Sequence, residues 1–204
     1  MKKSAVLVAI VGLATTFANF AVAAGDAAEG QKKSTVCAAC HGADGNTSAT
    51  PDTPKLAGQG EKYLTKQLMD FKSGARANAI MAGQVAALSE QDMMDLAAYY
   101  ASLEVQYSAV EDKYIDAGQT LYRAGDRDAG IPACTACHGP AGNGVDSAGF
   151  ASLGGQGPAY TIAQLKAFRS GARGNDMNRM MRDIAAKLSD EQIETIAYYL
   201  AGLH

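Results

Sequence analysis

The apolar residues near the end of each half of the chain recur with a helical period. They occupy positions i, i+3, i+4 and i+7 in two segments that lie 100 residues apart. These residues are Met93, Leu96, Ala97 and Tyr100 in the first segment, and Ile193, Ile196, Ala197 and Leu200 in the second. This spacing puts the apolar side chains on one face, so each segment is predicted to be an amphipathic helix.

A capping box precedes each of these two segments. Ser89 is followed three residues later by Asp92, and Ser189 is followed three residues later by Gln192. In such a box the serine oxygen and the later side chain satisfy free amide hydrogens of the first helical turn. We therefore predict that the two helices start at Ser89 and Ser189.

The rest of each half also has a helical pattern. Residues 61–72 and 158–169 predict a second helix in each half, and a shorter helix is predicted before each pair of cysteines. Strand-like alternation is absent. Glycine and asparagine gather after each histidine of the cysteine segments, which indicates irregular loops. The predicted fold class is all-α.

The two halves are copies of one another. Three blocks repeat with an offset of 97 residues, and a three-residue insertion then changes the offset to 100. The blocks are 37–42 with 134–139, 56–60 with 153–157, and 71–76 with 168–173. Two copies are too few for a solenoid. We predict two globular domains, residues 24–103 and 113–204, joined by a linker at 104–112.

Two glycines occupy corresponding positions in the predicted first helix of each copy. Gly30 corresponds to Gly118, and nine extra residues separate Gly118 from its cysteines. Without side chains, these glycines would let the first helix cross closely against Tyr99 or Tyr199 of the last helix.

The amino terminus has the order of segments found in a secretory signal peptide. Lys2 and Lys3 precede the uncharged run 4–23, which ends on the small-residue pattern Ala21-Val22-Ala23. We predict removal of residues 1–23 and export to the periplasm. An uncleaved membrane anchor is the alternative, which the abundance of Ala, Gly and Thr in the run disfavours.

The charge of the chain excludes one class of partner. Without residues 1–23, the chain has 16 basic and 21 acidic side chains, a net charge of −5. No strongly basic face is available to neutralise phosphates, so nucleic-acid binding is excluded.

All four cysteines lie in two C-x-x-C-H segments. These are Cys37, Cys40 and His41 in the first half, and Cys134, Cys137 and His138 in the second. The motif indicates c-type haem attachment, because two thiols one helical turn apart can add to the porphyrin vinyl groups while the histidine binds iron. A large, flat, apolar cofactor would also fill small domains that contain no Trp. We predict two covalently bound haem c groups.

Two other kinds of site use the same cysteines. A redox dithiol of the thioredoxin type needs a βαβ pattern, which this sequence lacks. A zinc site would need the two pairs together, but they lie 97 residues apart, each with its own histidine. Both alternatives are weaker than haem attachment.

A low-spin electron-transfer haem has a second axial ligand. The remaining histidine, His204, lies at the carboxyl terminus, so histidine cannot complete both sites. Met81 is the only methionine of the first half that pairs with another methionine, Met181. We predict Met81 and Met181 as ligands, with Met180 as the alternative because the insertion falls there. The other first-half methionines are predicted to be packing or surface residues: Met69, Met93 and Met94.

On these residues the chain resembles the dihaem cytochromes of the c-four family. The resemblance covers the mature sequence and includes Leu-x-Gly-Gln at 56–59 and 153–156 and Phe-x-Ser-Gly-x-Arg at 71–76 and 168–173. It implies two class-I-like cytochrome c domains facing each other across a pseudo-twofold axis, each wrapped around one haem. It also implies electron transfer from a quinol-oxidising complex to a terminal oxidase, with loose membrane association.

The two copies differ at one position that matters for the histidines. Pro54 stands where such domains place a proline whose carbonyl accepts a bond from the ligand imidazole, and the second copy has Ala151 there. Such a bond orients the ring and increases its basicity. A backbone carbonyl does not require proline, so the bond can persist in the second copy.

Arg76 and Arg173 also recur between the copies. They are candidates for pairing with haem propionates, because a guanidinium suits bidentate carboxylate recognition. The alternative is a pair of solvated arginines at helix ends.

The predicted function is outer-sphere electron transfer without a small-molecule substrate. An enzyme, either a dihaem peroxidase or a sulfur oxidase, would need an open iron and polar groups above it. A permanently bound electron-transfer subunit of a larger complex is the second alternative. Acids exceed bases in residues 24–103, whereas residues 113–204 hold nine of each. We hypothesise that this asymmetry lets the halves meet different redox partners.

Overall fold

The computed structural model describes residues 24–204, and the predicted signal peptide at 1–23 lies outside the described residues. Within this range the chain forms helices and loops, with two isolated β-bridges and no strand. The all-α prediction is therefore confirmed. No helix in the described range is long and apolar enough to cross a membrane.

Each half contains the same succession of helices. The first half consists of α1 (Ala27–Lys33), η1 (Ser34–Val36), α2 (Ala38–His41), α3 (Glu61–Ser73), α4 (Ala79–Val85) and α5 (Glu90–Ala101). The second consists of α6 (Asp112–Ala124), α7 (Thr135–His138), η2 (Asp146–Ala148), α8 (Pro158–Ser170), η3 (Met177–Arg179), α9 (Met180–Ala185) and α10 (Asp190–Gly202). Helices α3 and α8 match the predicted segments and run one residue further.

Both predicted capping boxes are present. The Ser89 side chain accepts a hydrogen bond from the Asp92 amide, and the Asp92 carboxylate accepts one from the Ser89 amide. Ser189 and Gln192 form the same pair of bonds. Because these bonds satisfy amides of the first turn, α5 and α10 begin directly after the two serines.

The prediction of a shorter helix before each cysteine pair is wrong for the second half. Helix α1 has 7 residues, but α6 has 13, as many as α8. In the first half the chain must reach Cys37 seven residues after Gly30, so α1 gives way to the tighter turn η1. The nine extra residues of the second copy remove this constraint, and α6 continues to Ala124.

The first helix of each half crosses the last one closely. A Cβ atom added to Gly30 would lie 2.0 Å from the Asp95 carbonyl oxygen and 2.8 Å from the Tyr99 Cβ. A Cβ atom added to Gly118 would lie 2.4 Å from the Tyr199 Cβ. These distances leave no room for a side chain, so the predicted glycine crossings are confirmed.

Each half has its own apolar core around these crossings. Helices α3 and α8 pack on α5 and α10 respectively. The first core is divided into two clusters, with buried residues Leu64, Leu96, Ala97 and Tyr100 in one and Phe71, Val85 and Met93 in the other. The second core is one cluster of Leu121, Tyr122, Ile131, Leu188, Ile193, Ile196, Tyr199, Leu200 and Leu203.

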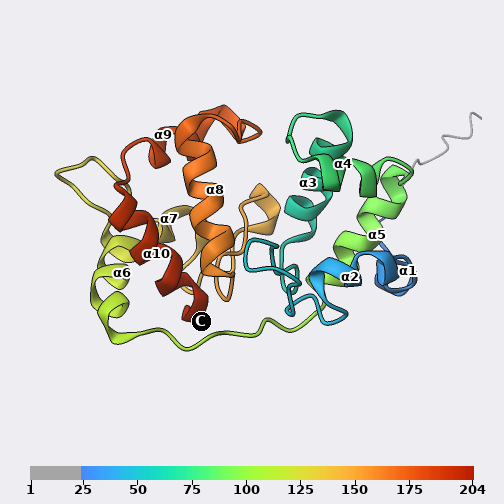
Figure 1. The fold of residues 1–204 in the computed structure, drawn as a ribbon, viewed down its shortest axis with the longest axis horizontal. Coiled ribbons are helices and arrows are strands. Elements are labelled where there is room, and N and C mark those ends of the chain that lie inside the picture. Colours follow the sequence, from blue (N-terminus) through green and yellow to red (C-terminus); the bar gives the residue numbers. More distant parts are fainter. Residues whose placement is uncertain (1–23) are drawn as a thin grey trace, which may run out of the picture.

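The two halves lie side by side, and the chain between α5 and α6 runs along both of them (Figure 1). The Gln106 amide donates to the Asn46 side chain of the first half at 2.9 Å. The Ser108 amide donates to the Ala201 carbonyl of the second half at 2.8 Å. The connecting segment is thus bonded to both halves.

Candidate functional site

Each pair of cysteines lies on a single helical turn. Cys37 immediately precedes α2, and the His41 amide donates to the Cys37 carbonyl at 3.0 Å. Cys134 and His138 form the same bond around α7, also at 3.0 Å. One turn therefore presents two thiols and an imidazole together, as the motif predicts.

Both motif histidines are oriented by a main-chain carbonyl. His41 Nδ1 lies 2.8 Å from the Pro54 oxygen, and His138 Nδ1 lies 2.8 Å from the Ala151 oxygen. Since a carbonyl only accepts, Nδ1 carries the proton and Nε2 is left with its lone pair. The second half makes this bond without a proline.

Burial keeps these imidazoles neutral. It lowers the pKa of His41 and of His138, although the hydrogen bond to Pro54 or Ala151 opposes the change. Burial also raises the pKa of the Cys134 thiol to about 11. A neutral imidazole with a free Nε2 is the form that binds a metal.

A cavity of about 710 Å³ lies between the two halves. The first half contributes Cys37, Cys40, His41 and Met81 to its lining. The second half contributes three methionines at or beside the insertion, Met177, Met180 and Met181, but not its cysteines or His138. Its volume and largely apolar lining suit a large apolar ligand.

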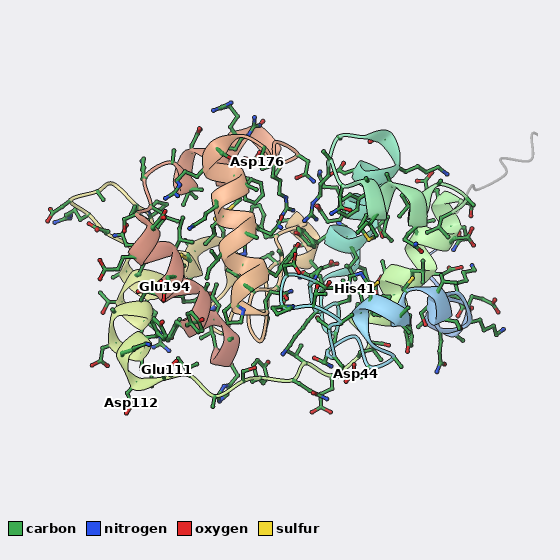
Figure 2. All side chains as sticks on the ribbon, in the orientation of Figure 1. His41, Asp44, Glu111, Asp112, Asp176 and Glu194 are labelled. Atoms are coloured by element: carbon green, nitrogen blue, oxygen red, sulfur yellow. The ribbon has the colours of Figure 1, made fainter. Side chains whose placement is uncertain are left out.

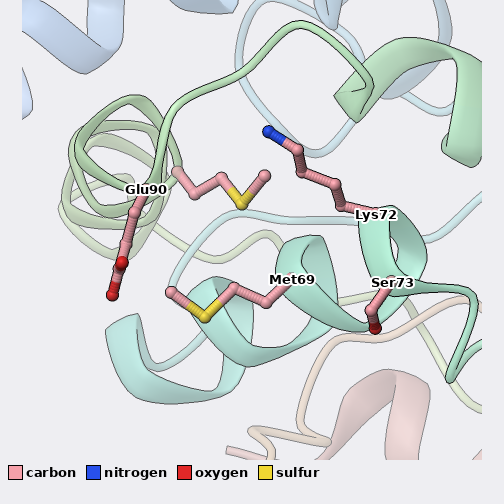
Figure 3. A pocket seen from close by; sticks show the side chains of 5 residues that line it. Met69, Lys72, Ser73 and Glu90 are labelled. Atoms are coloured by element: carbon pink, nitrogen blue, oxygen red, sulfur yellow. The ribbon is translucent and has the colours of Figure 1, made fainter.

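Methionines outside this cavity have a different environment. Met69 and Met93 line a separate hollow of about 310 Å³ between α3 and the start of α5, beside Lys72 and Glu90 (Figure 3). Met94 lines neither space. Among the first-half methionines of the described chain, Met81 alone faces the cavity that holds the thiols and the imidazole.

Arg76 and Arg173 meet across the interface instead of pointing into solvent. Arg76 donates to Gln67 of its own half and to Tyr160 and Gln164 of the other, at 2.8–2.9 Å. Arg173 makes the reciprocal contacts, to Gln164 and to Tyr63 and Gln67, at 2.9–3.0 Å. Both side chains are buried and line the cavity.

These buried guanidinium groups have only neutral partners. Neither forms an ion pair with a carboxylate among residues 24–204. Burial opposes ionisation of the Tyr63 hydroxyl, but the nearby Arg173 and Arg76 lower its pKa overall. Two buried charges without counter-charges are costly, so the site fits a ligand that carries carboxylates into the cavity.

A second polar group is also left for a ligand. The Tyr100 hydroxyl is buried, lines the cavity and has no hydrogen-bond partner within the described chain. Buried hydroxyl groups are normally paired. Together with the unpaired guanidinium charges, this hydroxyl supports a cavity shaped for a group with an apolar body and polar substituents.

Sequence reasoning missed the neutral members of the arginine cluster. Tyr63 and Gln67 recur as Tyr160 and Gln164 with the offset of 97. That recurrence was a usable signal, because polar residues that are retained in both copies on one helix face contact something in both. Their interdomain contacts could not be inferred without the relative placement of the halves.

The described residues offer little support for the zinc and disulfide alternatives. In the range 24–204 no three His, Cys, Asp or Glu side chains are grouped so that they could hold a metal ion. None of the four cysteines forms a disulfide in this range.

Comparison with known proteins decides the family. The cytochrome c family model matches residues 27–104 and again residues 115–204. The chain is 50% identical to cytochrome c4 of Pseudomonas aeruginosa over 89% of this chain and 90% of that protein. The chain belongs to the cytochrome c family, in its cytochrome c4 branch. It therefore binds two haem c groups covalently, and it transfers electrons with redox protein partners.

Two further relatives extend this assignment. The crystal structure of reduced cytochrome c4 from Pseudomonas stutzeri superposes with a TM-score of 0.85 at 49% identity, covering 89% of this chain and all of that one. A protein named thiosulfate dehydrogenase electron acceptor, from Stutzerimonas stutzeri, is 41% identical over 87% of each chain. The fold of two tandem cytochrome c domains is thus confirmed.

Proposed function

We propose that the protein is a periplasmic electron carrier whose two haems are each held by one C-x-x-C-H segment. The observation that carries the proposal is the matched environment of the two histidines. Each donates from Nδ1 to a carbonyl thirteen residues further on, so each Nε2 is available to an iron. Bound haem supplies an iron that alternates between the ferrous and ferric states.

The thiols and imidazoles have separate roles in this proposal. Cys37 and Cys40 form the thioether bonds of the first haem, and Cys134 and Cys137 form those of the second. His41 and His138 are the proximal ligands, oriented and made more basic by their carbonyl partners. Residues 24–103 and 113–204 are the two domains, joined by residues 104–112.

We assign the second axial positions to Met81 and Met181. Met81 lies four residues before the buried Val85, and Met181 lies four residues before the buried Ala185. Since side chains four residues apart share a helix face, both methionines have the same register relative to the core. Met180 also lines the cavity and remains the alternative in the second half.

Arg76 and Arg173 are proposed to face the haem propionates. The carboxylates would provide the counter-charges that both guanidinium groups lack. Replacing either arginine by Gln should shift the reduction potentials, and unchanged potentials in both variants would remove the reason for this role.

The ligand assignments can be tested on protein matured with its haem-attachment machinery. Mass spectrometry should show two added haems and loss of residues 1–23. Met81→Ala and Met181→Ala should each remove about half of the ferric sulfur-to-iron charge-transfer band, whereas Met180→Ala should leave it intact. Loss of the band in Met180→Ala, with Met181→Ala unaffected, would reassign the second ligand.

A carrier and an enzyme differ in how readily the iron opens. With methionine bound at both irons, exogenous cyanide should bind slowly to both ferric haems. Fast and tight cyanide binding at one haem would favour a peroxidase or a sulfur oxidase instead.

Two classes of electron donor are worth comparing. The first is a quinol-oxidising complex, with a terminal oxidase as acceptor. The second is a sulfur-oxidising enzyme, because two relatives at 41% and 37% identity are named thiosulfate dehydrogenase electron acceptors. Stopped-flow reduction of the purified protein by each donor discriminates them, since the physiological donor should reduce it much faster and with a stronger salt dependence.

A further inference from the structure

Two glutamines reach across the interface and clamp the main chain of the other half. Gln156 accepts a hydrogen bond from the Lys55 amide at 2.9 Å and donates to the Lys55 carbonyl at 3.0 Å. Gln59 accepts from the Ser152 amide at 2.7 Å and donates to the Ser152 carbonyl at 2.9 Å. Because these residues correspond at the offset of 97, the two clamps are reciprocal, as a pseudo-twofold interface requires.

Each clamp holds the same peptide group that orients a histidine. The Lys55 amide and the Pro54 carbonyl belong to one peptide, and that carbonyl accepts from His41 Nδ1 at 2.8 Å. A continuous path therefore runs from His41 through this peptide to Gln156.

The second path has the same form. His138 donates to the Ala151 carbonyl at 2.8 Å, and the amide of that peptide, which belongs to Ser152, donates to Gln59. Each histidine of one half is thus linked, through one peptide group, to a glutamine of the other half.

The glutamine bond can change the strength of the histidine bond, because both bonds are made to the same peptide group. Resonance couples the nitrogen and the oxygen of a peptide, so hydrogen bonds at its two ends polarise one another. An acceptor at the amide makes the carbonyl a better acceptor for the imidazole proton. A stronger bond at Nδ1 fixes the ring and makes Nε2 more basic, which favours the ferric state of a bound iron.

We propose that Gln156 is a positioning residue for His41, and that Gln59 is a positioning residue for His138. The proposal rests on the proposed function in that the two histidines are iron ligands. Docking of the halves then influences both irons through hydrogen bonds. Gln59 and Ser152 are buried, whereas Gln156 and Lys55 are half-buried, so the clamp that serves His138 is the better shielded of the two.

The test is a crossed pair of apolar variants, Gln156→Leu and Gln59→Leu, in the full-length protein with both haems attached. Gln156→Leu should lower the ferric-to-ferrous ratio of the first-half haem at a fixed applied potential by up to about twofold, because the lost bond acts on the iron only by polarising the bond at Nδ1. Gln59→Leu should do the same to the second-half haem. The haem in the variant's own half should change less.

The crossed design separates a specific link from a loosened interface. A loosened interface would shift both haems in both variants, and a local effect would shift the haem of the mutated half. Either pattern would overturn the proposal. NMR of ¹⁵N-labelled histidine gives a second measurement, since the Nδ1 proton of the opposite half should move upfield when its hydrogen bond weakens.

A wild-type measurement covers the case in which the variants do not fold. Amide exchange at Lys55 and Ser152 should be slowed on the order of a hundredfold or more by the two clamps. Exchange at the rate of an unprotected peptide would refute the clamps. If the variants keep two haems and the methionine band while both ratios stay unchanged, the glutamine link fails and the proposed function stands.

Discussion

The two methionine segments enter corresponding helices, α4 and α9, in different ways. In the first half, the chain enters α4 directly, and the Asn78 side chain caps the helix by accepting from the Met81 amide at 2.9 Å. In the second half, three additional residues form η3 before α9. There Asn178 and Arg179 adopt φ angles of 51° and 62°, the only left-handed residues other than glycine in the range 24–204.

An ion pair replaces the asparagine cap in the second half. Asp176 accepts from the Arg182 amide at 3.0 Å and from its Nε at 2.6 Å, and the Asp176 side chain is only 4% exposed. Figure 2 shows Asp176 beside the upper end of α8. The register of the methionine relative to the buried core is thus retained, while the entry to the helix changes from a cap to a braced and strained turn.

The helix crossings should give the largest difference between the halves. Gly30→Ala would force a methyl group against main-chain atoms of α5, and Gly118→Ala would force one against the Cβ atom and ring of the buried Tyr199. We expect losses in the free energy of unfolding of about 3 kcal/mol for Gly30→Ala and about 2 kcal/mol for Gly118→Ala. Denaturant unfolding of the holoprotein measures both.

Gly83→Ala is the matched control for these two variants. Gly83 lies inside α4, and a Cβ atom there meets nothing within 4 Å. Alanine should therefore stabilise the protein by up to about 1 kcal/mol through helix propensity. Equal losses in the free energy of unfolding for Gly30→Ala and Gly118→Ala would show that a clash with main-chain atoms costs no more than a clash with a side chain.

Substitutions at the starts of α4 and α9 should give the next largest losses in the free energy of unfolding. Asp176→Asn loses a charge-assisted bond at a buried position and should cost about 2 kcal/mol. Asn78→Ala loses one neutral cap bond and should cost about 1 kcal/mol. The ferric sulfur-to-iron charge-transfer band shows which haem is affected. Each variant should weaken methionine ligation only in the half that carries the substitution. A larger loss in the free energy of unfolding for Asn78→Ala than for Asp176→Asn would contradict the view that the ion pair stabilises its helix start more than the asparagine cap does.

The sequence predicts those features of the fold and of the site that depend on residues close together in the chain. The capping boxes at Ser89 and Ser189 predict the start of a helix from four consecutive residues. The C-x-x-C-H segments predict haem attachment from five. The entry to α9 depends on Asp176 meeting Arg182 across a turn with two left-handed residues, which no local pattern encodes. The partners of Arg76 come from the other half and depend on how the halves dock, so its burial could not be inferred from its helix-end position.

Protonation of Asp176 at low pH should reduce the stability of the segment that carries Met181. Burial opposes ionisation of Asp176, but its bonds to Arg182 prevail and lower its pKa below the usual value. A lowered folded-state pKa gives stability that is complete above the unfolded value of about 3.9 and is lost as the pH falls through the folded value. The gap in unfolding free energy between wild type and Asp176→Asn should therefore narrow below about pH 4, and a constant gap down to pH 2 would exclude this mechanism.

The smallest expected effect concerns the strain at the second entry. Arg179 is 63% exposed at its side chain and forms a 3.5 Å surface ion pair with Asp183, which contributes little. Its left-handed backbone costs about 1 kcal/mol for a residue with a Cβ atom, a cost that glycine avoids. Arg179→Gly should therefore raise the free energy of unfolding by about 0.5 kcal/mol, whereas Arg179→Ala, which keeps the strain, should not. If both variants change the free energy of unfolding by the same amount, the left-handed backbone angle of Arg179 contributes nothing. The turn before α9 is then no more strained than the capped start of α4.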